Sequence, residues 1–153
     1  MAVSFVTLFV ALRPHLRTLV GRIGLACLLI AAVGLSMAGI FTTDPITTPA
    51  AEMTTSGMLH NIGATLNLAM TLAAVLLCWQ LVRNPAWRGR LRPLLWSTGV
   101  AVACSVAFIG LTILLLPSDG QFGPDVKIAW LGRIEIVAYS VWLMVVARQV
   151  LRL

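Results

Sequence analysis

The sequence predicts an all-α bundle of transmembrane helices, and three observations lead to this fold class. Hydrophobic residues make up 59% of the 153 residues and charged residues only 10%, whereas a soluble domain is about 45–50% apolar and about 25% charged. The apolar residues form four long segments, and all seven prolines lie outside them. This composition excludes a water-soluble enzyme, and we expect a polytopic membrane protein with four full spans plus a short N-terminal half-helix.

Each of the four segments is close to or above the about 20 residues that a helix needs to cross a bilayer. A shorter apolar helix at residues 2–12 ends at Arg13-Pro14, and at about 1.5 Å per residue it is too short to cross. It lacks the basic start and the cleavage site of a signal peptide, so it is either the last half of a longer helix or a segment that enters one leaflet. Residues 1–153 are expected to form one transmembrane domain, with spans at residues 23–41, 57–82, 94–116 and 126–146.

The charged residues predict the orientation of the bundle. Nine of the eleven Lys and Arg residues fall in connections on one side, where the C-terminus also lies. Cytoplasmic loops of membrane proteins are enriched in Lys and Arg, so we expect these connections and the C-terminus in the cytoplasm of a bacterial inner membrane. The opposite loops carry Lys127 and the acidic residues Asp44, Glu52, Asp119 and Asp125.

Four arginines between the second and third spans predict contact with anionic lipid head groups, although their role in setting the topology explains them equally well. Membrane lipids are therefore the expected partners, with anionic lipids on the cytoplasmic side, and the net charge of +6 does not call for nucleic acid. The four are Arg83, Arg88, Arg90 and Arg92. Aromatic belts are expected from Trp79, Trp87 and Trp96 at the inner interface and Trp130 near the outer one.

Small residues four positions apart predict close contacts between helices, as in Gly34-x3-Ala38 and Ser97-x3-Ala101-x3-Ser105. Such patterns support a compact bundle without identifying which helices meet, because they arise often in an alanine-rich chain.

Two charged residues, Arg133 and Glu135, lie inside the last predicted span, where each costs at least about 2.5–3.5 kcal/mol. They are about 200° apart around the helix and cannot pair with each other. We expect Glu135 to face the bundle interior in its neutral form. Its expected hydrogen-bond donor is Asn67, His60 or a partner subunit.

Three further polar residues are expected at the same outer end. Asp44 follows the first span, His60 lies about one turn into the second span, and Asn67 shares a helical face with His60. Together with Arg133 and Glu135 they predict a polar site open to the extracytoplasmic side, serving as a proton relay, a head-group pocket or a hydrolytic centre. The alternative is a network that only fixes helix packing, with Asp44 capping a loop.

No cofactor and no metal are expected. The three cysteines are widely spaced inside apolar segments, which argues against a disulfide framework or a zinc site. His15 and His60 are expected on opposite sides of the membrane, so they cannot both ligate one haem.

Two short motifs resemble those of the bacterial membrane family catalogued as domain of unknown function 998. The chain has Gly39-Ile-Phe-Thr-Thr-Asp44 at a helix end and Gly57-Met-Leu-His60 at the start of the next helix, and the family shows Gly-x-Phe-x-x-Asp and Gly-x-x-His there. Gly132-Arg133 resembles the arginine near the outer end of the family's last helix.

The resemblance runs from about Gly21 to the C-terminus and implies about six transmembrane helices with no established activity. Asp44, His60 and Arg133 would be the family's polar signature, whereas Glu135 has no counterpart in it. Relative to that pattern, the chain is expected to lack the first helix and part of the second.

Two functions follow from these features. The first is a structural or accessory subunit of a membrane assembly, with other subunits or copies of itself as partners, because the half-length helix leaves one flank poorly covered. The absence of a complete catalytic constellation also favours a protein that is not an enzyme. The alternative is an enzyme or transporter acting on a lipid or ion at the outer leaflet, with His60 as base or metal ligand, Asp44 orienting it and Arg133 clamping a phosphate or carboxylate.

Overall fold

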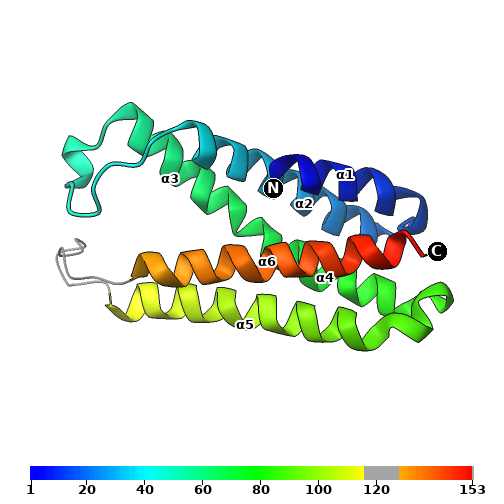
Figure 1. Cartoon of the computed structure of the whole chain (residues 1–153). Helices are drawn as coiled ribbons and strands as arrows, with labels where there is room; N and C mark the ends of the chain where they lie inside the picture. The colour runs from blue at the N-terminus through cyan, green and yellow to red at the C-terminus, as the bar shows by residue number, and fades with distance from the viewer. Residues whose placement is uncertain (116–127, 153) are drawn as a thin grey trace.

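The computed structural model describes residues 1–115 and 128–152, and it confirms the predicted all-α fold. Within these residues the helices lie side by side as an elongated bundle (Figure 1). Four helical segments are long and apolar enough to cross a membrane, so the chain is a multi-pass membrane protein. These segments are Leu19–Ile40, Thr55–Arg83, Pro85–Leu115 and Ile128–Val150.

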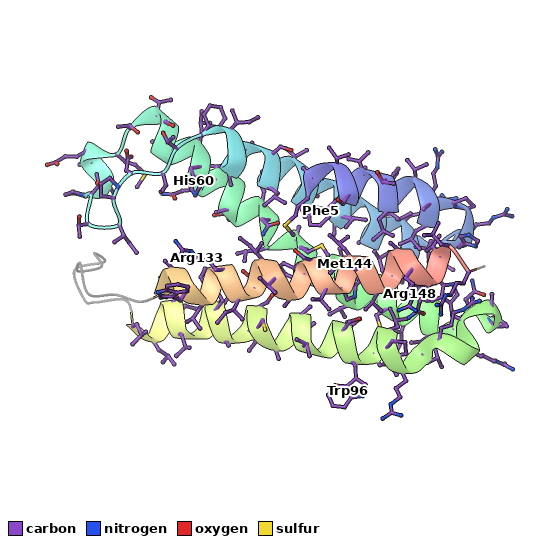
Figure 2. All side chains as sticks on the ribbon, in the orientation of Figure 1. Phe5, His60, Trp96, Arg133, Met144 and Arg148 are labelled. Atoms are coloured by element: carbon purple, nitrogen blue, oxygen red, sulfur yellow. The ribbon has the colours of Figure 1, made fainter. Side chains whose placement is uncertain are left out.

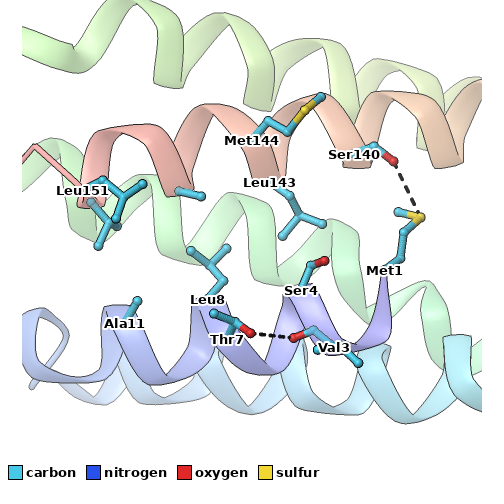
Figure 3. Close-up of a pocket in the computed structure, with 12 residues that line it drawn as sticks. Met1, Val3, Ser4, Thr7, Leu8, Ala11, Ser140, Leu143, Met144 and Leu151 are labelled. Atoms are coloured by element: carbon cyan, nitrogen blue, oxygen red, sulfur yellow. Dashed lines mark hydrogen bonds between the residues drawn. The ribbon is translucent and has the colours of Figure 1, made fainter.

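The short first helix, α1 (Ala2–Leu12), packs along part of the bundle and is too short to cross the membrane. Phe5, Leu8 and Leu12 are buried on one face of it, at the spacing of an amphipathic helix. Helix α1 packs against α2 (Leu19–Ile40) and α6 (Ile128–Val150). Between α1 and α6 an apolar groove of about 470 Å³ remains (Figure 3).

Helices α2 and α3 (Thr55–Asn67) meet in backbone contact at two glycines. A Cβ atom added to Gly34 would lie 2.5 Å from the Gly63 carbonyl oxygen, and one added to Gly63 would lie 2.6 Å from the Gly34 carbonyl oxygen. Neither position has room for a side chain. This crossing brings the start of α3 beside the end of α2.

The second predicted span, residues 57–82, lies within the candidate span Thr55–Arg83, and its helix is interrupted at Leu68. The chain divides there into α3 and α4 (Ala69–Arg83). At the break, the Leu68 amide donates to the Thr65 carbonyl at 3.1 Å and the Leu68 carbonyl accepts from the Thr71 amide at 3.1 Å. These bonds join residues three apart, so the turn is tighter than an α-helix.

A short 3-10 helix, η3 (Pro85–Arg90), leads into α5 (Leu91–Leu115). Helix α5 starts before the predicted residue 94 and contains Pro93 in its first turn, where proline costs no helical hydrogen bond. The predicted ends at residues 116 and 126 lie outside the described residues, as do Asp119, Asp125 and Lys127.

The tryptophans divide into two groups. Trp79, Trp96 and Trp130 are exposed, as residues of an aromatic belt would be. Trp87 is wrong as a belt residue because it is 0% exposed and belongs to the core. It belongs to η3 (Pro85–Arg90), between α4 and α5, at the same end of the bundle as the C-terminus (Figure 1).

Candidate functional site

A cavity of about 530 Å³ lies between α2, α3, α5 and α6, on the half of the bundle away from the arginine-rich connections. Its wall is mostly apolar, with Leu35, Phe108 and Ile136 among the lining side chains. Figure 2 shows His60 on α3 and Arg133 on α6 at this end, and Arg148 at the other. Four of the five predicted site residues line the cavity, namely His60, Asn67, Arg133 and Glu135.

Asp44 does not line this cavity. Its carboxylate accepts hydrogen bonds from the Thr54 amide at 2.8 Å and the Thr54 hydroxyl at 2.9 Å. Thr54 in turn caps α3 by accepting from the Gly57 amide at 3.0 Å. A Cβ atom on Gly57 would lie 2.0 Å from Asp44 Oδ2, so Asp44 and Gly57 are fitted to each other. Asp44 therefore organises the connection between α2 and α3, as the packing alternative expected.

His60 is half-buried and is held by the end of α2. Its Nδ1 lies 3.0 Å from the Phe41 carbonyl oxygen. A carbonyl oxygen can only accept, so Nδ1 carries a proton, and in the neutral ring Nε2 is the acceptor. The Asp44 connection and this bond together fix where His60 stands on the cavity wall.

Asn67 is the last residue of α3 and lies at the break before α4. Its Oδ1 atom is buried and has no hydrogen-bond partner among the described residues. Leaving a buried acceptor unpaired costs about 1–3 kcal/mol.

Arg133 is exposed, and its guanidinium lies over the Trp130 ring at 4.8 Å from the centroid. This distance is within the range of a cation–π contact. The side chain thus lies at the rim of the cavity, where its guanidinium can form a bidentate pair with a phosphate or a carboxylate.

Glu135 is 4% exposed, which agrees with its expected position inside the bundle. The expected donors Asn67 and His60 are wrong. Its Oε1 atom accepts from the Ser105 hydroxyl at 2.7 Å and from the Tyr139 hydroxyl at 3.2 Å. Tyr139 also hydrogen-bonds Ser105, and it reaches Thr71 on α4 at 2.6 Å.

These bonds belong to a larger feature that sequence reasoning missed, which we call the polar seam. A further bond runs from Trp142 Nε1 to Thr98 Oγ1 at 2.9 Å. One signal was available, because Ser105 ends the small-residue row that begins at Ser97. The polar seam joins α4, α5 and α6 and consists of Thr71, Thr98, Ser105, Glu135, Tyr139 and Trp142.

The arginines predicted to contact lipid head groups take different positions. The Arg83 guanidinium lies 3.9 Å from the centroid of the Trp79 ring. Arg90 donates to the Ala86 carbonyl at 3.2 Å and the Arg152 carbonyl at 2.6 Å, and so ties η3 to the C-terminus. Arg88 and Arg92 are exposed. Lipid contact at all four remains a prediction.

Within residues 1–115 and 128–152, no group of three or more His, Cys, Asp or Glu side chains is placed to hold a metal ion. The cavity offers a different chemistry, since the side chains of Arg133, His60 and Asn67 line it together with apolar residues. That arrangement suits a molecule with a polar head and an apolar body.

The family comparison extends the resemblance over the whole helical bundle. A family model described as protein of unknown function (DUF998) matches residues 1–149, which includes α1 as well as the segment from Gly21 onward. No curated protein and no solved structure matches the chain. With nearly all of its length matched, the chain belongs to the DUF998 family of proteins of unknown function.

Proposed function

We propose that this protein handles an amphiphilic molecule with an anionic head group, such as a phospholipid of the outer leaflet, and binds it in the 530 Å³ cavity. One observation carries the proposal. The same cavity is lined by the polar residues His60, Asn67 and Arg133 and by apolar side chains. Its volume lies within the range of about 300–1,000 Å³ that is typical of small-molecule sites.

Each polar group has a part in this proposal. Arg133 at the rim supplies a bidentate donor for a phosphate or carboxylate oxygen. The Nε2 atom of His60 can accept from a hydroxyl or amide of the same head group. Leu35, Phe108 and Ile136 provide the apolar surface for a hydrocarbon chain.

Glu135 sets a condition on the ligand, because it lies in the same wall. An ionised carboxylate there would repel an anionic head group. The proposal therefore has Glu135 neutral, and its Oε1 bonds to Ser105 and Tyr139 are compatible with this form.

For the orientation, we propose that the arginine-rich end and the C-terminus face the cytoplasm of a bacterial inner membrane, and that the cavity serves the opposite leaflet. Nine of the eleven Lys and Arg residues support this. Reporter fusions to Leu153 test it, and a reporter that is active outside the cytoplasm would overturn it.

Ligand binding is tested on the full chain, purified in mild detergent, by native mass spectrometry and analysis of the extracted lipids. Arg133→Gln is expected to lose the anionic lipid that binds in the 530 Å³ cavity, because it removes the charged head-group donor. Arg148→Gln is the matched control, since Arg148 is an exposed arginine of the same helix at the far end. Equal lipid content in the two variants would contradict the proposal.

A second candidate is the accessory subunit, and one observation favours it. Met1 and Ala2 line the cavity, so it lies beside the start of the short helix α1, on the flank where a partner subunit would pack. A photo-crosslinking residue in place of the exposed Ala64, which also lines the cavity, separates the two functions. A lipid adduct supports the ligand, whereas a polypeptide adduct overturns it in favour of a partner helix.

A further inference from the structure

A second cavity, of about 510 Å³, lies at the opposite end of the bundle along the contact between α1 and α2. Three arginines from consecutive parts of the chain line it. Arg13 belongs to the turn after α1, Arg17 to the connection, and Arg22 to the first turn of α2, and all three side chains are exposed. The cavity therefore has three guanidinium groups at its rim.

The surroundings of these arginines are electropositive. Helix α2 is 22 residues long and starts beside them, at its N-cap Thr18, so the positive end of its dipole adds to their charge. The described side-chain carboxylates are remote, because Asp44 and Glu52 lie in the connection at the other end of the bundle (Figure 1) and Glu135 lines the 530 Å³ cavity.

The rest of the wall is apolar. Phe9 on α1 and Leu25 and Leu29 on α2 form it, running from the arginines toward the middle of the bundle. A free inorganic anion would use the arginines alone. A molecule that joins a phosphate to a hydrocarbon chain would use both parts of the wall.

We infer that this cavity is a binding site for an anionic phospholipid, with the phosphate on Arg13, Arg17 and Arg22 and an acyl chain against Phe9, Leu25 and Leu29. It is separate from the cavity of the proposed function, from which it differs in position and in every lining residue. The bound lipid bridges α1 to α2 and so holds the short first helix in place.

The test uses native mass spectrometry of the full chain with phosphatidylglycerol, with phosphatidylcholine of the same acyl chains, and with inorganic phosphate. Phosphatidylglycerol is expected to be retained. In the triple variant Arg13→Gln, Arg17→Gln, Arg22→Gln its affinity should fall about 100-fold, because each arginine contributes to holding the anion. The control carries Arg148→Gln and Arg152→Gln, which remove two charges from exposed positions at the same end, outside the loop that is predicted to contact lipid head groups.

An equal loss in the control would overturn the site, since the effect would then be one of net charge. If inorganic phosphate displaces phosphatidylglycerol, the apolar wall does not contribute to binding. If phosphatidylcholine is retained equally well, the arginines do not select an anionic lipid. The single variant Arg22→Gln, expected to lose about five-fold, keeps the test decisive if the triple variant fails to fold. Arg133→Gln should leave this binding unchanged, so its outcome is independent of the proposed function.

Discussion

Helices α2 and α3 approach each other in a different way from α5 and α6. At the first contact the backbones touch at Gly34 and Gly63, and no side chain lies between them. At the second, Ser105, Glu135 and Tyr139 join the helices by side-chain hydrogen bonds. Helices in lipid gain little from hydrophobic burial against each other, so close packing and polar bonds must hold them together.

The comparison shows two kinds of sensitivity to mutation. The glycine contact has no room for an added atom, whereas the polar seam loses hydrogen bonds when a polar atom is removed. The cavity of the proposed function lies between these two helix pairs and depends on both for its walls.

The largest effect is expected from Gly63→Leu, which breaks the glycine contact. The first added carbon would already lie 2.6 Å from the Gly34 carbonyl oxygen, so α2 and α3 must separate. Overpacking of this kind costs about 3 kcal/mol or more. Thermal unfolding followed by tryptophan fluorescence measures the loss, with Gly99→Leu as control because nothing lies within 4 Å of a Cβ there. Similar shifts in both variants would rule out the backbone contact as the cause.

Glu135→Ala is expected to cost about 1–3 kcal/mol, because it leaves the Ser105 and Tyr139 hydroxyls without their acceptor. Glu135→Gln retains an oxygen for both donors and should cost less than about 1 kcal/mol. The free energy of unfolding is measured for both variants by titration with a mild denaturant. If Gln is as damaging as Ala, Glu135 is a charged residue with a cationic partner, and the neutral form proposed above is wrong.

A smaller loss of about 1 kcal/mol is expected from Tyr139→Phe. This change removes a single hydroxyl, through which Thr71 on α4 reaches Glu135. Thr112→Val is a suitable control, since Thr112 donates to the Phe108 carbonyl within its own helix at 2.6 Å. Unfolding temperatures that match in the two variants would mean that the tyrosine hydroxyl adds nothing between helices.

The smallest effect, about 0.5–1 kcal/mol, is expected from Asp44→Asn, which weakens the connection outside both contacts. One oxygen remains to accept from the Thr54 amide, so α3 keeps its start. Lipid retention in native mass spectrometry should not change, because Asp44 does not line the cavity. If Asp44→Asn loses as much lipid as Arg133→Gln does, Asp44 contributes to ligand binding after all.

Much of the fold was predictable from the sequence, because the length and hydropathy of each span follow from the thickness of a bilayer. The break at Leu68 was not, since residues 64–72 contain neither glycine nor proline. The row Gly34-x3-Ala38 predicted a close contact, but an alanine-rich chain offers many such rows. Nothing in the sequence singled out Gly63 as the partner.

For the candidate site, the sequence predicted how deep the residues lie in the membrane but not which hydrogen bonds they form. The cost of a charge in lipid placed Glu135 inside the bundle. Its partners depend on how α5 and α6 are rotated about their axes, and helical spacing alone does not give this rotation. Asp44 was predicted as a site residue because it lies at the same end of the bundle as the others. Its carboxylate instead accepts hydrogen bonds from Thr54 within the loop.

The turn at Leu68 has a consequence for local opening of the bundle. A continuous helix exchanges its amide hydrogens as one cooperative unit, whereas an interruption lets the two halves open separately. Helices α3 and α4 both pack against α2, and α4 is tied in addition to α6 through the bond from Thr71 to Tyr139. We therefore expect the α3 half of this crossing, which carries His60, to exchange its amide hydrogens faster than the α4 half.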